Sequence, residues 1–381
     1  MMETMTSAER IRTAIALGKP DRVPVAPIMD FFASRYGGIT QYDMFFDIGK
    51  ADAALEKTLN DLGFVDGLNL NYAGMGRMLR LIFPVPPVLP GIDGVPRDAQ
   101  FQFVERSVMK PEEYAQIAQR GPTRWLLDKL RENHPELRGA SGMAKAFGIM
   151  LSDNMKIRRS MKRWRGRGVD FLVGPNITFI PLQMISLGLR AFNDTLYDMF
   201  RYPEELKLGT SALLKLLIRE GMMQVKLSGL RRVFLAADRA SASFLSPKQF
   251  EEFALPDIQE MCDYFISRGI GVLLHLDNNW APFYHYFKSL PRGKCILNLD
   301  GSSDIFKAQE VLAGHMCIMG DVPADLLKLG EPGEVDEYCR RLIMEVGADG
   351  GFILSSGCTV PADAKPENVR AMIQSVKNYR P

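Results

Sequence analysis

Long apolar runs, closely paired cysteines and an excess of one charge are all absent from this chain of 381 residues. No apolar stretch approaches the roughly 18 residues that a membrane-spanning helix needs, and the N-terminal residues mix charged with apolar side chains, unlike a secretory signal. The 47 basic and 45 acidic residues nearly cancel, so the net charge indicates neither a nucleic-acid nor a membrane partner. The five cysteines are odd in number and never closely paired, which argues against a disulfide framework and favours a reducing, cytoplasmic compartment.

Short apolar runs alternate with amphipathic stretches from residue 230 onward. Five of these runs end at a polar residue or turn, and they span residues 231–238, 270–277, 294–300, 315–321 and 350–358. Apolar strands separated by helices are typical of a parallel sheet that helices cover. Three earlier runs have the same character, at residues 23–29, 63–70 and 169–176. We therefore predict eight βα units, which make an α/β protein of the (β/α)8 TIM-barrel class.

The rest of the predicted architecture is one barrel domain over residues 1–381, with an N-terminal amphipathic helix opened by Thr6 or Ser7. An insertion between the second and third strands spans about residues 71–165, and its proline-rich stretch followed by QFQFVER predicts a hairpin outside the barrel. An open doubly wound sheet is the alternative. It would normally place a glycine-rich phosphate loop after its first strand, and the segment DFFASRYGG found there has no G-x-G-x-x-G.

Seven basic residues lie close together in KIRRSMKRWRGRG, residues 156–168, where we expect a basic helix. Such a run is usually the solvated face of a helix. The functional alternative is a docking patch that steers an acidic partner, such as a corrinoid protein, towards the enzyme. Nucleic-acid binding is a weaker third reading, because nothing else in the chain supports it.

The carboxyl ends of the predicted strands hold the residues that carry chemistry, as expected of a barrel enzyme. These residues are Asn176, Asp238, His275 with Asp277, Asp300, Asp321 and Cys358. A single aspartate is weak support for function, because carboxylates also solvate a barrel rim. His275 is more informative, since the chain has only four histidines and this one ends an apolar run, with Asp277 on the same face of the strand.

His275, Asp277 and Cys358 together predict a metal site. Zinc binds histidine nitrogen, carboxylate oxygen and cysteine sulfur, and a catalytic zinc keeps three protein ligands and one open position. The alternative is that His275 orients the substrate by hydrogen bonding and that Cys358 is a small buried apolar residue. No Cys-x-x-Cys or His-Glu-x-x-His signature decides between them.

Several segments resemble the uroporphyrinogen decarboxylase superfamily, which has the TIM-barrel fold. They are ERIRTAIALGKPDRVPV, SPKQFEEFALPDIQEM, VLLHLDNNW, MGDVPADLL and GGFILSSGCTVPADAKPENVRAMI. The likeness covers nearly the whole chain and is weakest in the insertion. It implies either cofactor-free decarboxylation of a porphyrinogen or methyl transfer to or from a corrinoid protein, as in the methanol, methylamine and aryl-methyl-ether systems.

Two departures from the family patterns bear on that choice. The decarboxylases carry an arginine-rich segment after the first strand that grips substrate carboxylates, whereas the segment here has only Arg35. The methyltransferases typically carry His-x-Cys where this chain has His275 and Asp277, and a later cysteine that matches Cys358. The resemblance thus implies a modified zinc site, in which a hard carboxylate favours an oxygen-bound methyl donor over a thiol, or no zinc at all.

We therefore expect a methyltransferase that moves a methyl group from a small methylated substrate, of the methoxylated aromatic kind, to the cobalt of a corrinoid protein. Zinc or acid assistance at the ether oxygen would make the phenolate a better leaving group. A cofactor-free decarboxylase of the uroporphyrinogen decarboxylase type is the alternative enzyme, and a non-catalytic binding module is the alternative outside enzymology.

The expected site residues divide into three groups. His275, Asp277 and Asp238 are the catalytic candidates, and His275, Asp277 and Cys358 are the candidate zinc ligands. Asn176, Asn279 and Trp280 are the candidates for substrate contact. Trp280 opens an aromatic stretch in which Phe283 and its neighbours stand at helical spacing, so the rest of that stretch is expected to be core.

Overall fold

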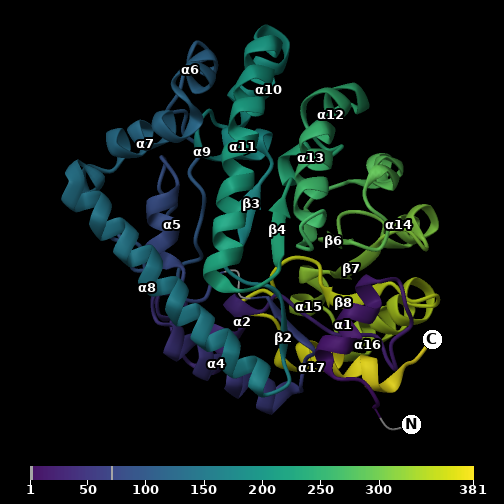
Figure 1. Ribbon diagram of the computed structural model, residues 1–381. Helices are drawn as coiled ribbons and strands as arrows, with labels where there is room; N and C mark the ends of the chain where they lie inside the picture. The colour runs from purple at the N-terminus through teal and green to yellow at the C-terminus, as the bar shows by residue number, and fades with distance from the viewer. Residues whose placement is uncertain (1–2, 70–71) are drawn as a thin grey trace.

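The computed structural model describes residues 3–69 and 72–381, and parallel strands lie inside a layer of helices (Figure 1). Six strands pair in sequence order: β3 (Ile177–Phe179), β4 (Arg232–Ala236), β5 (Gly271–Leu276), β6 (Cys295–Leu299), β7 (Cys317–Val322) and β8 (Phe352–Ser356). A second parallel pair consists of β1 (Gly67–Asn69) and β2 (Asp170–Val173). The strands β4, β5, β6 and β8 lie within the runs of residues that predicted them, and β7 extends one residue beyond its run, to Val322.

Residues 23–29 close the ring between the two sheets. The amide of Ala26 donates to the Leu354 carbonyl at 2.8 Å, and the amide of Asp66 donates to the Val25 carbonyl at 2.9 Å. On the other side, β2 continues after a short break into β3, so this one strand position pairs with β1 at its start and with β4 at its end. The predicted (β/α)8 barrel is confirmed.

Two predicted strands are shorter than expected because of proline. Residues 23–29 form only isolated bridges, at Val25 and Ile28, since Pro24 and Pro27 have no amide proton to donate. The run 169–176 breaks at Gly174–Asn176, around Pro175, and so appears as β2 and β3. Residue 70 of the predicted second strand and residue 71 at the start of the insertion lie outside the described residues.

The N-terminal helix α1 (Ser7–Ile15) begins at Thr6, whose side chain accepts from the Glu9 amide in a capping box. Its Ile11 belongs to the apolar cluster inside the barrel, beneath the strand residues that point inward. Beside it, the buried carboxylate of Asp66 accepts from Arg10 and Arg22, each at 2.6 Å. Helix α1 therefore packs against the amino-terminal end of the barrel interior and leaves the carboxyl end for the site.

The insertion is helical. It holds α5 (Gly76–Ile82), α6 (Glu113–Arg120), α7 (Pro122–Asn133), η1 (Pro135–Leu137) and α8 (Gly139–Gly166). Where the hairpin was predicted, the described residues 72–112 form a single antiparallel bridge, between Val88 and Gln102, and no strand ladder. Four prolines in residues 84–90 leave the first arm too few amide donors for a ladder.

The basic residues 156–167 occupy the second half of α8 and its end, which leads into β2 at the amino-terminal end of the barrel. Arg163 pairs with Asp52, Arg165 with Asp170 at 3.2 Å and Arg167 with Glu56 at 2.7 Å. This part of α8 therefore faces away from the carboxyl ends of the strands. Its arrangement favours the solvated, ion-paired helix face over a docking patch that serves a barrel-mouth site.

The remaining helices connect and cover the strands. They are α2 (Asp30–Gly37), α3 (Gln41–Phe46), α4 (Ile48–Leu62), α9 (Pro181–Gly188), α10 (Phe192–Arg201), α11 (Pro203–Ser228), η2 (Asp238–Ala240), α12 (Pro247–Phe253), α13 (Leu255–Ile266), η3 (Ala281–Ser289), α14 (Ile305–Leu312), α15 (Ala324–Leu329), α16 (Pro332–Arg341), η4 (Leu342–Val346) and α17 (Pro366–Asn378). In the described chain, no helix is long and apolar enough to cross a membrane.

Candidate active site at the barrel mouth

A cavity of about 410 Å³ lies at the carboxyl ends of the strands. Side chains alternate along a strand, so His275 points to the same side of β5 as Leu273, which belongs to the apolar cluster inside the barrel. His275, Asp277 and Cys358 reach the cavity from β5 and from the loop after β8. Aromatic side chains form much of its wall: Tyr72, Phe83, Phe103, Phe179, Phe192, Phe234 and Phe244.

Asn298 of β6 fixes the orientation of the His275 ring. The Asn298 side-chain amide donates to the Met319 carbonyl at 3.3 Å, which turns its Oδ1 towards His275. The Nδ1 atom of His275 lies 2.7 Å from that oxygen and therefore carries a proton that it donates. The second ring nitrogen, Nε2, is thereby directed at Asp277 and Cys358.

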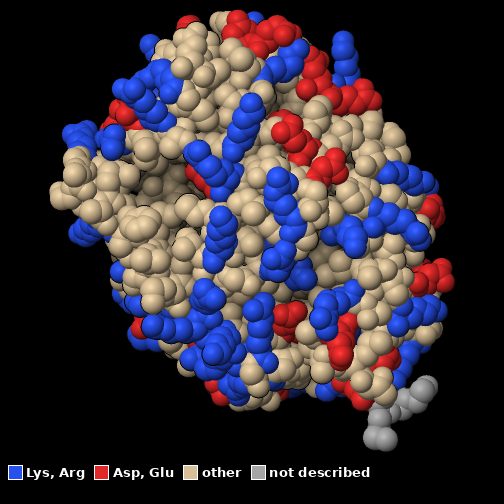
Figure 2. All heavy atoms as spheres, viewed as in Figure 1, with Lys and Arg blue, Asp and Glu red and all other residues tan. Residues whose placement is uncertain are grey.

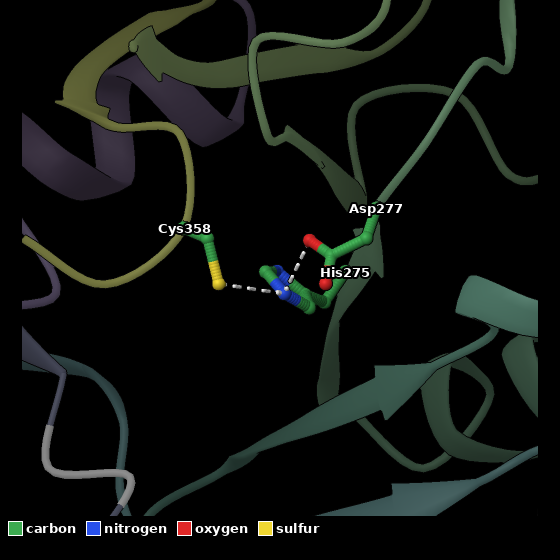
Figure 3. Close-up of side chains that lie close together, drawn as sticks. All are labelled: His275, Asp277 and Cys358. Carbon is green, nitrogen blue, oxygen red and sulfur yellow. Dashed lines mark hydrogen bonds and ion pairs between the residues drawn. The ribbon is translucent and has the colours of Figure 1, made fainter. Parts of the chain in front are cut away.

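Three potential ligand atoms converge in front of this nitrogen (Figure 3). The Asp277 Oδ1 atom lies 3.1 Å from His275 Nε2, and the Cys358 Sγ atom lies 3.8 Å from it. All three atoms lie within 4.8 Å of one another. The three side chains that sequence analysis assigned to one site are therefore together in the structure.

His275 and Asp277 form a close pair in which each residue stabilises the charged form of the other. Burial works against a charged His275, which is 6% exposed, but the negative charge of Asp277 and the nearby Cys358 hold the pKa of His275 well above its ordinary value. Burial also works against a charged Asp277, yet the positive His275 lowers the pKa of Asp277. Without a metal, the site thus favours an imidazolium–carboxylate pair.

The same atoms fit a zinc ion. Zinc bonds of about 2.0–2.3 Å in a tetrahedron place neighbouring ligand atoms about 3.3–3.8 Å apart, close to the separations of Nε2 from the oxygen and the sulfur. The Asp277 Oδ1 atom is buried and makes no aligned hydrogen bond within the described chain, although it lies near Nε2. An acceptor in this state is suited to a cation. His275, Asp277 and Cys358 would hold such an ion as the three protein ligands that a catalytic zinc has.

Asp238 begins η2 just after β4 and lines the same cavity. Its Oδ1 accepts from the Asp277 amide at 3.3 Å, and its Oδ2 accepts from the Gln183 side chain at 3.1 Å. Burial and the neighbouring Asp277 raise the pKa of Asp238 to about 6. Asp238 therefore positions the Asp277 backbone and is itself a carboxyl group that titrates near neutrality.

The three residues predicted to contact substrate do not line the cavity. Trp280 is fully buried, and its indole donates to the Asp277 carbonyl at 2.8 Å. Asn279 is exposed, and its side chain accepts from the Ala281 amide at 3.1 Å. Asn176 is fully buried and donates to two carbonyls at the start of β4. The hydrogen bonds of all three side chains are to the backbone, and the bond from Trp280 helps to place Asp277.

Neither Asp300 nor Asp321 reaches the cavity, although both stand at strand ends. Asp300 accepts from the Asn278 amide at 2.8 Å, and Asp321 accepts from the Tyr338 hydroxyl at 2.8 Å. Asn278 has a left-handed backbone, with φ at 72°, and its side chain lines the cavity where Asn279 was expected.

Sequence analysis missed three polar residues of the site. Asn298 interrupts the apolar run CILNL, and a lone amide inside a buried strand is a signal that it has a buried partner. Gln183 lies on α9 and Tyr72 lies at the start of the insertion, where no periodic pattern connects them to the strand ends. Burial, followed by Cys358 and nearby carboxylates, raises the pKa of Tyr72 well above its ordinary value, so its phenol stays protonated.

Comparison with known proteins identifies the family that this sequence resembles. The sequence pattern of the family described as "Uroporphyrinogen decarboxylase (URO-D)" matches residues 177–379. A uroporphyrinogen decarboxylase of Wigglesworthia glossinidia brevipalpis is 30% identical over 95 residues, 24% of this chain and 26% of that protein. The methylcobamide:CoM methyltransferase MtbA of Methanosarcina acetivorans is 24% identical over 141 residues, 37% of this chain and 40% of that protein. The matches thus span well under half the length of these two relatives.

A solved structure matches over nearly the full length. A methyltransferase from Methanosarcina mazei superposes with a TM-score of 0.71 at 15% identity, covering 98% of this chain and 99% of that one. At 15% identity this match shows a shared fold and no more. Because it covers nearly the whole chain, the shared fold includes the insertion.

Proposed function

The chain belongs to the uroporphyrinogen decarboxylase family, and we propose that it is a methyltransferase that works with a corrinoid protein. The substrate in this proposal is a small methoxylated aromatic, which loses its methyl group to the cobalt of the partner protein. The name of the relative MtbA, which includes a methylcobamide, supports this branch of the family. The observation that carries the proposal is the convergence of His275, Asp277 and Cys358 on an aromatic-walled cavity.

The cavity matches the substrate class in size and in kind. Ligand sites range from about 300 to 1,000 Å³, so 410 Å³ is enough for a single substituted ring. Aromatic walls stack against such a ring or meet its edge. Phe234 also contacts His275, with 4.8 Å between ring centroids, so a bound ring in that part of the cavity lies close to the reacting groups.

The proposed step breaks the bond between the methyl carbon and the ether oxygen. The electron pair of that bond stays on the oxygen, and reduced cobalt of the partner supplies the pair that binds the methyl group. In the metal-free site His275 is the protonated group next to this position, and its proton neutralises the phenolate. A zinc ion held by His275, Asp277 and Cys358 would supply Lewis-acid assistance to the same oxygen.

The partner must reach the cavity at the carboxyl ends of the strands, because the methyl group passes directly to its cobalt. The docking surface in this proposal is therefore the barrel mouth, and the basic run 156–167 at the other end of the barrel has no part in it.

A porphyrinogen decarboxylase is the alternative within the family, and the lining of the cavity gives it little support. A polyanionic substrate needs several cations, whereas Arg239 is the one arginine or lysine among the described lining residues. Arg239 already pairs with Glu105, and Asp238 and Asp277 add negative charge to the same cavity. Arg35 lies on α2 and does not line it.

The test is turnover with chemically reduced cobalamin and a panel of methoxybenzoates and methoxyphenols. We expect growth of the methyl–cobalt absorbance together with release of the matching phenol, and loss of both in His275→Ala. If no member of the panel gives methyl–cobalt absorbance, the substrate class is wrong. Release of CO2 from a carboxylated substrate, without cobalamin, would favour the decarboxylase instead.

A further inference from the structure

A second cavity of about 270 Å³ adjoins the first on the side of the insertion. Helices α7 and α8 form its outer wall, and α11 forms the wall nearer the barrel. Figure 2 shows a hollow between the positions of α8 and α11, with mostly uncharged atoms around it. Phe147 on α8 lines this cavity and is 66% exposed, so it lies where the cavity meets solvent.

The two cavities share part of their walls. Seven residues line both, among them Phe83, Phe179 and Gln224. The lining beyond these shared residues is mostly apolar and comes mainly from leucine and methionine side chains of α5, α7, α8 and α11. The second cavity is thus an apolar extension of the first, about two-thirds as large.

Polar groups are few in the extension, and one marks the junction. The Oε1 atom of Gln224 is buried and accepts no hydrogen bond from the described part of the chain, although a buried acceptor normally has a partner. Glu220, one helical turn before it on α11, also lines the extension, and burial raises the pKa of Glu220 to about 7. The extension is therefore an apolar space, and the Gln224 oxygen at its inner end is available to a hydrogen-bond donor on a ligand.

We propose that the second cavity binds an apolar tail of the substrate, either an alkyl chain or a second ring attached to the methylated aromatic ring. A hydroxyl group near the start of this tail donates to Gln224. The substrate is then an extended, two-part molecule, of which only the methylated end meets His275. This inference rests on the proposed function for the identity of that end, while the tail subsite follows from the second cavity itself.

The experiment measures binding of phenols that carry para-methyl, para-propyl or para-hexyl groups, by calorimetry on the full chain. These probes lack a methoxy group, so binding is read without turnover. Each methylene buried in the second cavity should tighten binding about fourfold until the cavity is filled. A hydroxyl on the first carbon of the propyl group should tighten binding further, and Gln224→Leu should abolish that gain.

Ala146→Leu fills the second cavity from α8 without touching the first, because Ala146 lines only the second. It should weaken binding of the para-hexyl compound at least tenfold and leave the para-methyl compound unchanged. Ala144→Leu is the matched control, since Ala144 is exposed on the same helix and should change neither. If Ala146→Leu does not fold, Met150→Trp makes the same test from the next turn of the helix.

Equal affinity for short and long chains, or chain-length dependence that survives Ala146→Leu and Met150→Trp, would overturn the tail subsite. Chain-length dependence without methyl transfer from any methoxylated compound would retain the subsite and refute the proposed function. Methyl transfer without chain-length dependence would retain the proposed function and refute the tail subsite. The two proposals therefore fail separately.

Discussion

Replacing Asn298 with leucine tests whether the hydrogen bond behind His275 tunes the site. Asn298 is fully buried, and its Oδ1 lies 2.7 Å from His275 Nδ1. Leucine has the same branched shape and no acceptor, so Asn298→Leu leaves a buried N–H without a partner. The hydrogen-bond partner of a metal-binding histidine fixes the ring and raises the basicity of the other nitrogen. Mutation of this partner typically lowers metal affinity 10- to 100-fold.

We expect zinc binding by Asn298→Leu to be about 10- to 100-fold weaker than in the unchanged protein, measured by competition with a chromophoric chelator. In the metal-free protein, loss of the acceptor should lower the pKa of His275, because the bond stabilises the charged ring; a proton NMR titration of the His275 ring reads this directly. The unsatisfied group should also cost about 1–3 kcal/mol of folding free energy.

Asn176→Leu is the matched control. Asn176 is equally buried and loses two hydrogen bonds to backbone carbonyls, but it has no contact with His275. It should reduce stability while zinc affinity and the pKa of His275 stay unchanged. If Asn298→Leu binds zinc as tightly as the unchanged protein, or if both variants lower zinc affinity equally, the assigned role of Asn298 is refuted.

Three further predictions concern the metal site and a buried carboxyl group. Cys358→Ser should lose zinc by metal analysis, whereas Cys262→Ser and Cys339→Ser, on helices α13 and α16, should retain it; a fully active zinc-free protein would overturn the metal reading. Asp277→Cys should bind zinc more tightly than the unchanged protein in the same chelator competition, since a second thiolate suits the ion better; weaker binding would contradict the ligand assignment. Because burial raises the pKa of Glu220 to about 7, the folded state keeps a proton that the unfolded state loses, and stability falls between about pH 4.5 and 7. Glu220→Gln should therefore raise the free energy of unfolding by up to about 3 kcal/mol at pH 8 and change it little at pH 4. Thermal unfolding measured at both pH values checks this, and an equal gain in stability at the two would disprove it.

The strands of the C-terminal half could be predicted because a buried parallel strand is apolar on both faces and stands out as a continuous run. The position of His275 and Asp277 followed from this, since residues at a strand end share one rim of the barrel. Cys358 joined them for the same reason, although it is 83 residues away in the sequence.

The features that the sequence could not predict depend on local backbone conformation or on contacts between distant segments. Asn278 adopts a left-handed backbone, which turns Asn279 outward, and no pattern in the sequence marks that φ angle. Trp280 packs against Phe250 and Phe287, and its place in the core depends on a helix that precedes β5. The second cavity depends on how the insertion folds over α11, and in that region the proline-rich segment predicted a hairpin, of which one antiparallel bridge forms.

The ring of strands is joined at residues 23–29 by few backbone hydrogen bonds, and its partners there come from near the two ends of the chain. Contacts between residues so far apart in sequence carry a large cost in chain entropy, so they form late in folding. The six-stranded sheet from β3 to β8 is continuous without this join and already contains the frame that holds His275, Asn298 and Cys358. During synthesis, the N-terminal segment would wait for β8 before the circle could close. The buried cluster around Asp66 would meanwhile hold residues 22–25 beside the start of β1, ready for that closure.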